Sequence, residues 1–112
     1  METVLIVEDE VKARDVLIEL LRKDGRDFVT AGDGQEAIEC LAKGSRPRLI
    51  LLDLVMPRMD GWEFLRRQSA DPLIASIPTI VLSGSERPAG AKHHLTKPVD
   101  VDRLRALIDL YC

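Results

Sequence analysis

Short apolar runs alternate along this chain with longer stretches in which apolar residues recur at helical spacing. Five short runs predict β-strands, at residues 4–7, 28–31, 49–52, 80–82 and 93–96. An apolar run of four residues that is ended by a charge, as Asp53 ends the run 49–52, is typical of a strand buried on both faces. The runs therefore predict a sheet that is covered on both sides.

Four stretches predict amphipathic helices. The first covers residues 10–23 and stops before Gly25, a residue type favoured just after a helix. The second is expected to begin after the N-cap Asp33, with Glu36 as the capping-box partner, and to stop near Gly44. The third runs from about 61 to 68, and the fourth follows the N-cap Asp100. Their apolar stripes are Val11, Val16, Leu17, Leu20 and Leu21 in the first, Ala37, Ile38 and Leu41 in the second, Phe64 and Leu65 in the third, and Val101, Leu104, Leu107, Ile108 and Tyr111 in the fourth.

The alternation of strands and helices predicts βαβ units with right-handed crossovers and a parallel sheet. We expect one α/β domain over residues 1–112: a flavodoxin-like, doubly wound five-stranded sheet of order 2-1-3-4-5. The segment 84–91 breaks the pattern, because it holds two glycines, a proline and no large apolar residue. The fourth helix is therefore expected to be absent or reduced to a turn.

Composition narrows the class of protein without naming a function. The 112 residues are 46% hydrophobic and 31% charged, as in an ordinary soluble domain, and the net charge of -3 gives no general basic field for nucleic acid. The apolar runs are far shorter than the ~20 residues of a membrane span. The two cysteines have no metal or redox spacing, and the start shows no signal-peptide pattern, so we expect a cytoplasmic protein.

Polar side chains stand where the predicted strands end. Glu8 and Asp9 follow the first strand, Asp53 the third, Ser83 the fourth, and Lys97 the fifth. Ligands of open parallel sheets bind outside the carboxyl ends of the strands, where the strand order reverses. The first and third strands flank that point, so the two acidic groups are expected to lie side by side.

This set of residues predicts a magnesium-dependent phosphoryl site. Clustered carboxylates repel one another unless a cation lies among them, and oxygen ligands suit Mg²⁺. Asp9 and Asp53 are the expected direct ligands, with Glu8 acting through a water and the backbone carbonyl of Val55 completing the protein's share. A second oxygen of Asp53 could attack phosphorus. Mg²⁺, the Lys97 ammonium and the Ser83 hydroxyl would then neutralise the phosphoryl oxygens.

Taken together, these residues resemble the receiver domain of response regulators in two-component signalling. The resemblance covers nearly the whole chain and includes Met56-Pro57 and Gly61 after the third strand and Pro98 after Lys97. It implies that Asp53 accepts a phosphoryl group from a kinase phosphohistidine, with Mg²⁺, and that the acylphosphate is later hydrolysed. It also implies a cis Lys97-Pro98 peptide bond.

The resemblance implies partners as well. One is a histidine kinase or a phosphotransfer protein, and the other is a downstream protein or a fused output domain, with no direct contact to nucleic acid or membrane. The chain would be no enzyme beyond its own phosphorylation and dephosphorylation. Both a stand-alone regulator and a domain of a larger protein fit this interpretation.

Two features depart from the family pattern. Ser83 and Lys97 are 14 positions apart, which is short by roughly eight residues, or about two helical turns. His94 stands at the switch position, three before the lysine, where the family usually has Tyr or Phe. We expect phosphate bound by Ser83 to order the segment 84–91 rather than to shift a packed helix.

Three other functions fit parts of the sequence. A phosphatase of the haloacid dehalogenase type needs an acid-base residue two positions after the nucleophile. Val55 stands there and can serve neither as acid nor as base. A flavin carrier needs a phosphate loop after the first strand, where Glu8, Asp9 and Glu10 would repel phosphate. A receiver-like scaffold that is never phosphorylated fits the short fourth crossover but not the intact acids. His93 and His94 could suggest a metal pair, but neighbours on a strand point to opposite faces.

Overall fold

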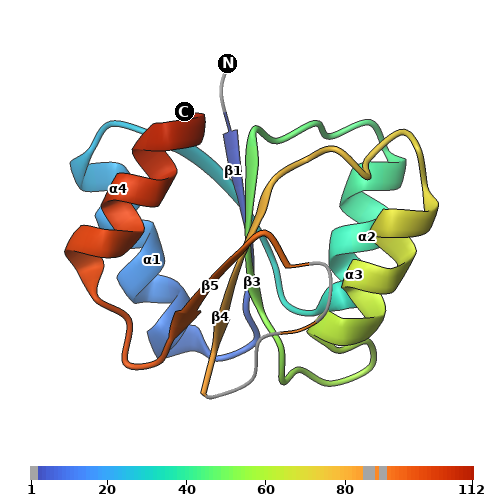
Figure 1. Ribbon diagram of the computed structural model, residues 1–112, viewed down its shortest axis with the longest axis horizontal. Coiled ribbons are helices and arrows are strands. Elements are labelled where there is room, and N and C mark those ends of the chain that lie inside the picture. Colours follow the sequence, from blue (N-terminus) through green and yellow to red (C-terminus); the bar gives the residue numbers. More distant parts are fainter. Residues whose placement is uncertain (1–2, 85–87, 89–90) are drawn as a thin grey trace.

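A computed structural model describes residues 3–84, 88 and 91–112. Five strands form one sheet in the order β2-β1-β3-β4-β5, and every neighbouring pair is parallel (Figure 1). The strands are β1 (Thr3–Val7), β2 (Asp27–Ala31), β3 (Leu49–Asp53), β4 (Thr79–Ser83) and β5 (His93–Thr96). The predicted flavodoxin-like fold and its strand order are confirmed.

Helices cover both faces of the sheet. They are α1 (Val11–Lys23), α2 (Gly34–Ala42), α3 (Gly61–Ala70) and α4 (Val101–Tyr111). Figure 1 shows α1 and α4 on one face of the sheet and α2 and α3 on the other. These four are the helices of the described residues, which include no helix between β4 and β5. Most of the segment 84–91 lies outside the described residues, as does its predicted ordering by phosphate.

Side-chain caps fix where three of the helices begin. Asp33, Asp60 and Asp100 each accept hydrogen bonds from backbone N–H groups of the first turn, which otherwise lack partners. The predicted capping box at α2 is wrong in one detail. The Glu36 carboxylate accepts a hydrogen bond from the backbone N–H of Gly32, at 3.1 Å, one residue before the cap. Asp33 is therefore the cap, and Glu36 ties down the chain that enters the helix.

The core consists of two apolar layers separated by the sheet. All five residues of β3 are buried, and they alternate between the layers. Leu49 and Leu51 join the layer under α1 and α4, whereas Ile50 and Leu52 join the layer under α2 and α3. β3 is thus the most enclosed strand together with β4, and it holds the Asp53 backbone rigidly at its end.

Three valines predicted to face the core are instead exposed. Val11 and Val16 of α1 are 56% and 60% exposed, and Val101 of α4 is 43% exposed. The buried stripe of α1 is Leu17, Leu20 and Leu21, and the three valines lie beyond the narrower arc that reaches the sheet. No helix of the described residues is long and apolar enough to cross a bilayer.

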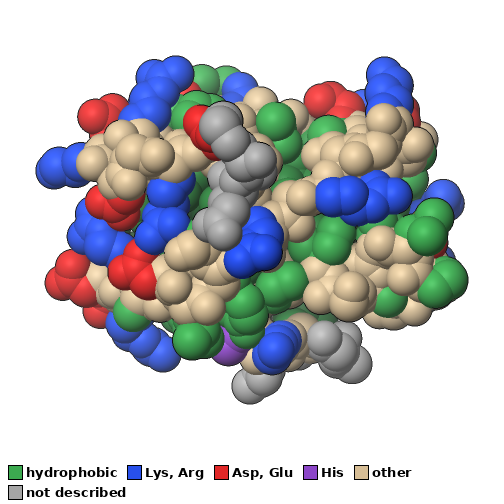
Figure 2. All heavy atoms as spheres, turned by 90° about the horizontal axis from the view of Figure 1, so that it is seen from above, with side chains coloured by type: hydrophobic (Ala, Val, Ile, Leu, Met, Phe, Trp, Pro, Cys, Tyr) green, Lys and Arg blue, Asp and Glu red, His purple; other side chains and the backbone are tan. Residues whose placement is uncertain are grey.

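The end of the sheet where the strands begin has a mixed surface. Figure 2 views the molecule from this end and shows Lys and Arg side chains interspersed with acidic ones. The acids predicted to form a site lie at the other end, where the strands finish.

Candidate functional site

Three carboxylates meet where β1 and β3 end. Glu8 and Asp9 follow β1 directly, Asp53 is the last residue of β3, and the two strands are hydrogen-bonded neighbours. One carboxylate oxygen from each of the three acids lies within 4.8 Å of the other two. Glu8 and Asp53 are 2% and 8% exposed, while Asp9 is exposed. The predicted grouping of acids distant in sequence is therefore present in the fold.

Lys97 provides the positive charge beside these acids. Its Nζ lies 3.2 Å from Asp53 Oδ1 and 3.7 Å from Glu8 Oε2. Its backbone N–H donates to the carbonyl oxygen of Ser83 at 2.7 Å, which holds the residue at the end of β5. The Lys97-Pro98 peptide bond is cis, as the resemblance implies. The ammonium can therefore reach a group attached to Asp53 from the side of β5.

The site carries more negative than positive charge, and the pKa values reflect this. The pKa of Glu8 is raised from 4.5 to about 7, chiefly by burial; the Asp53 charge, a hydrogen bond to the Asp53 carboxylate and the Asp9 charge act in the same direction, and Lys97 opposes them. Burial alone would lower the pKa of Lys97, but the Glu8 and Asp53 charges outweigh burial and raise it. Lys97 is therefore held as a cation beside the acids.

The donor set fits a hard divalent cation. Three carboxylates with ligand oxygens within 4.8 Å of one another offer the few oxygen ligands that Mg²⁺ takes from protein while it keeps several waters. Val55 lies in the loop after β3 and is 74% exposed. Its backbone carbonyl is predicted to be a ligand of the cation. Its role as a ligand remains a prediction.

The loop after β3 is held closely against the strand end. The backbone N–H of Gly61 donates to the carbonyl oxygen of Leu54 at 2.8 Å. A Cβ on Gly61 would lie 2.5 Å from the carbonyl oxygen of Asp53, closer than any real contact. Glycine at this position therefore allows α3 to begin directly beside the phosphoacceptor candidate.

A second contact of this loop was not predicted from the sequence. Arg58 has a positive φ of 61°, and its Nε donates to Oδ2 of Asp33 at 2.7 Å. Burial would raise the pKa of Asp33, but the hydrogen bond from Arg58 and backbone N–H donors lower it. A carboxylate that caps α2 thus also anchors the loop after β3. The cap was visible in the sequence, but the ion pair depends on a backbone turn that no local pattern signals.

Ser83 ends β4 beside the acids. In the register of β3 and β4, Asp53 pairs with Leu82, so Ser83 is one residue beyond this pairing. The residue is 5% exposed, and its Oγ lies 2.6 Å from Nε2 of His94 on β5. The sequence predicted the hydroxyl but not this contact. The two-residue period of β5 puts His94 and Thr96 on one face, but the register that brings His94 to Ser83 is not specified by the sequence.

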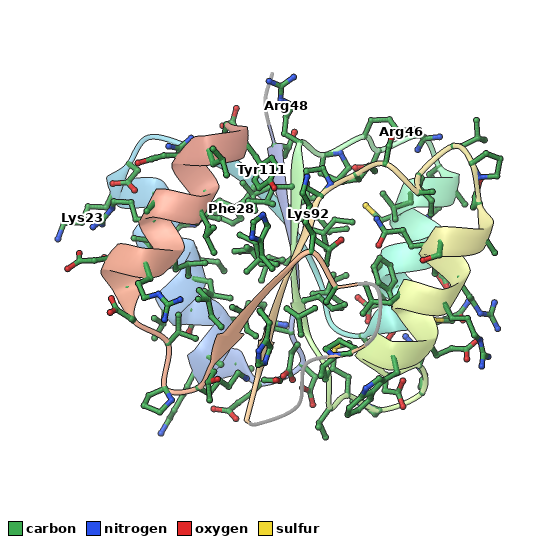
Figure 3. All side chains as sticks on the ribbon, in the orientation of Figure 1. Lys23, Phe28, Arg46, Arg48, Lys92 and Tyr111 are labelled. Carbon is green, nitrogen blue, oxygen red and sulfur yellow. The ribbon has the colours of Figure 1, made fainter. Side chains whose placement is uncertain are left out.

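The two histidines do not form a metal pair. His93 Nε2 lies 2.5 Å from the hydroxyl oxygen of Tyr111, and the two rings meet edge to face. The Lys92 ammonium lies 5.4 Å from the centre of the Tyr111 ring, and Figure 3 shows the two labelled side chains next to each other. His93 thus contacts α4 on one face of the sheet, while His94 contacts Ser83.

Comparison with known proteins decides the family. The model of the response regulator receiver domain matches residues 4–109. The chain belongs to this family. Sporulation initiation phosphotransferase F of Bacillus subtilis (strain 168) is 32% identical over 118 residues, covering 98% of this chain and 93% of that protein. The receiver domain is therefore a phosphoacceptor signalling domain of two-component systems.

Solved structures agree in fold. The receiver domain of a signal transduction histidine kinase from Syntrophus aciditrophicus is 29% identical with a TM-score of 0.91, covering 99% of this chain and 89% of that one. The receiver domain of a sensor histidine kinase from Pseudomonas aeruginosa PAO1 is 24% identical with a TM-score of 0.88, covering 98% of this chain and 96% of that one. That structure has a magnesium ion coordinated in its active-site cleft.

Proposed function

We propose that Asp53 is the phosphoacceptor of this receiver domain and that the group comes from a phosphohistidine of a histidine kinase or phosphotransfer protein. The observation that carries the proposal is the meeting of Glu8, Asp9 and Asp53 within 4.8 Å with the Lys97 ammonium 3.2 Å from Asp53. This is the arrangement that phosphoryl transfer needs, because the protein's part in that reaction is mainly positioning and charge neutralisation.

Asp53 acts as the nucleophile. One of its carboxylate oxygens forms a bond to phosphorus while the bond between phosphorus and the donor's imidazole nitrogen breaks, and that nitrogen keeps the electron pair. Lys97 neutralises one phosphoryl oxygen, and the Ser83 hydroxyl donates a hydrogen bond to another. The loop held by Gly61 keeps the Asp53 backbone in place during the transfer. Hydrolysis of the acylphosphate later returns the carboxylate.

Glu8, Asp9 and Asp53, with the carbonyl of Val55, are the residues that would hold Mg²⁺. Bound there, Mg²⁺ supplies positive charge for the phosphoryl oxygens and relieves the repulsion among the acids. The magnesium in the cleft of the Pseudomonas receiver domain supports this assignment, as does the acidic cluster of this chain. The domain catalyses its own phosphorylation and dephosphorylation, acts in the cytoplasm, and signals to a downstream protein or a fused output domain.

Labelling with a small phosphodonor tests the proposal. With acetyl phosphate and Mg²⁺, intact-mass analysis should find one phosphoryl group on the wild type and none on Asp53→Asn. Asp15→Asn, which removes an exposed aspartate of α1, is the matched control and should be labelled as the wild type is. Equal labelling of Asp53→Asn and the wild type would overturn the assignment.

A further inference from the structure

The segment 31–34, which joins β2 to α2, is hydrogen-bonded to both parts of the chain that carry the proposed cation ligands. On one side, the backbone N–H of Glu8 donates to the carbonyl oxygen of Ala31 at 3.1 Å. On the other side, the backbone N–H of Gly34 donates to the carbonyl oxygen of Met59 at 2.9 Å. A Cβ on Gly34 would lie 2.7 Å from that same oxygen, so the two backbones are in close contact. The segment therefore bridges the end of β1 and the loop after β3.

A side-chain ion pair strengthens this bridge. Asp33 is 4% exposed, and both of its carboxylate oxygens are used. Oδ1 accepts a hydrogen bond from the backbone N–H of Glu36 at 2.9 Å, and Oδ2 accepts one from Nε of Arg58 at 2.7 Å. Because the carboxylate is buried, the pair is screened less than an ion pair that lies wholly on the surface. The guanidinium of Arg58 is thereby fixed to the start of α2.

The backbone of Arg58 shows why the loop needs such an anchor. Its φ of 61° lies in the left-handed region, which is unfavourable for a residue with a Cβ. Residues in this region persist where their surroundings hold them, and they concentrate at sites that bind ligands. The ion pair to Asp33 is the contact that holds the side chain of Arg58, with a second, longer one of 3.5 Å to Glu36. The loop after β3 is therefore held in a conformation that its own backbone does not favour.

The carbonyl of Val55 depends on these anchors. The Val55 side chain is exposed, so its packing does little to fix the residue. The carbonyl oxygen of Leu54, just before it, accepts a hydrogen bond from the backbone N–H of Gly61 at 2.8 Å. After Val55, the next anchors are Arg58 and Met59, both bonded to the segment 31–34. The position of the Val55 carbonyl is thus set by the loop on either side of it.

We propose that Arg58 and Asp33 are positioning residues for the divalent cation: their ion pair holds the loop after β3 in the conformation that keeps the Val55 carbonyl ready as a ligand. The inference rests on the proposed function, which assigns Mg²⁺ to the acids and to this carbonyl. It adds two residues that contact neither the cation nor the phosphoryl group. A ligand that is already ordered loses less conformational freedom when the cation binds, so the ion pair increases the affinity for Mg²⁺.

Calorimetric titration with Mg²⁺ alone tests the proposal. Arg58→Gly removes the guanidinium but tolerates the positive φ, and should raise the dissociation constant of Mg²⁺ roughly tenfold. Asp33→Asn should have the same effect, because its one amide oxygen can cap Glu36 but its NH₂ group then faces the Arg58 donor. The double variant should bind no more weakly than either single variant, since both remove one pair. Arg67→Ala, which breaks an ion pair to Glu63 on α3, is the matched control and should bind as the wild type does.

Phosphorylation by acetyl phosphate at graded Mg²⁺ concentrations separates positioning from a general loss of structure. In Arg58→Gly, the Mg²⁺ concentration that gives half the maximal rate should rise roughly tenfold, in step with the dissociation constant. The maximal rate at saturating Mg²⁺ should stay near that of the wild type, because Asp53 and Lys97 are unchanged. A lower maximal rate with an unchanged Mg²⁺ dependence would contradict the proposal.

Asp9→Ala distinguishes failure of this inference from failure of the function on which it rests. If Asp9→Ala binds Mg²⁺ as tightly as the wild type, the proposed cation site itself is wrong. If Asp9→Ala loses Mg²⁺ while Arg58→Gly binds it normally, the role of the ion pair alone is overturned. Effects of Arg58→Gly and Asp33→Asn that multiply in the double variant would overturn it equally, because the two residues would then act separately.

Discussion

Removal of the Glu8 carboxylate should change how stability depends on pH in buffer free of divalent cations. Glu8 is 2% exposed, and the substitution Glu8→Gln keeps its shape while it removes the titrating group. Its pKa in the folded domain is about 7, against 4.5 for an unperturbed glutamate. A raised folded-state pKa means that the folded domain binds this proton more tightly than the unfolded chain does.

The sign and the size follow from that difference. The contribution of protonated Glu8 to the free energy of unfolding is fully present below pH 4.5 and is lost as the pH rises through about 7. A shift of about 2.5 units (7 − 4.5) corresponds to about 3 kcal/mol at 1.36 kcal/mol per unit. For a domain of this size that is roughly 10 °C in melting temperature.

Urea unfolding provides the measurement. The single tryptophan, Trp62, is 40% exposed at the start of α3 and can report unfolding by fluorescence. The difference in unfolding free energy between wild type and Glu8→Gln should change by up to about 3 kcal/mol from pH 4.5 to 8, with the variant gaining relative to wild type. Glu19→Gln, at an exposed position of α1, is the control and should run parallel to wild type. Parallel curves for Glu8→Gln would refute the reasoning.

The remaining predictions concern the metal and the loops. Mg²⁺ should raise the melting temperature of wild type, since it binds only the folded domain, and Asp9→Ala should lose most of that gain; an equal rise in both would place the metal elsewhere. Gly61→Ala should cost about 1–3 kcal/mol in urea unfolding, because its Cβ meets backbone, whereas Gly84→Ala, whose Cβ meets nothing within 4 Å, should cost far less. Asp33→Ala should lower the free energy of unfolding by about 1–2 kcal/mol, because the cap of α2 is lost. Asp33→Asn should recover most of this free energy unless the ion pair to Arg58 dominates. Because Arg58 and backbone donors lower the pKa of Asp33 in the fold, its contribution should disappear as the pH falls through the acid range, which unfolding of Asp33→Asn against wild type between pH 5 and 2 would show.

The site could be predicted from the sequence because parallel strands bring their carboxyl ends to one edge of the sheet. Because Asp53 ends a buried strand, its approach to Glu8 and Asp9 follows from the strand order alone. Lys97 lies at the same edge because it follows β5, and the structure adds the distances. Topology sufficed here because these residues stand directly at strand ends.

Contacts that depend on the rotation of a helix about its axis or on the conformation of a loop cannot be predicted from the sequence pattern. The exposure of Val11 and Val16 depends on the angle at which α1 meets the sheet, which the spacing of apolar residues leaves free. The pair of Arg58 and Asp33 depends on a residue with positive φ. The bond of Ser83 to His94 depends on the register of β4 and β5, which the sequence does not specify.

Chemical trapping of the phosphorylated residue tests the central claim most directly. The wild type would be treated with acetyl phosphate and Mg²⁺, reduced with borohydride, and digested for mass-spectrometric sequencing. Reduction of an aspartyl phosphate produces homoserine, so the proposal predicts homoserine at position 53 and none when Mg²⁺ is chelated. Homoserine at another aspartate, or none at position 53 in a sample whose intact mass shows a phosphoryl group, would contradict it.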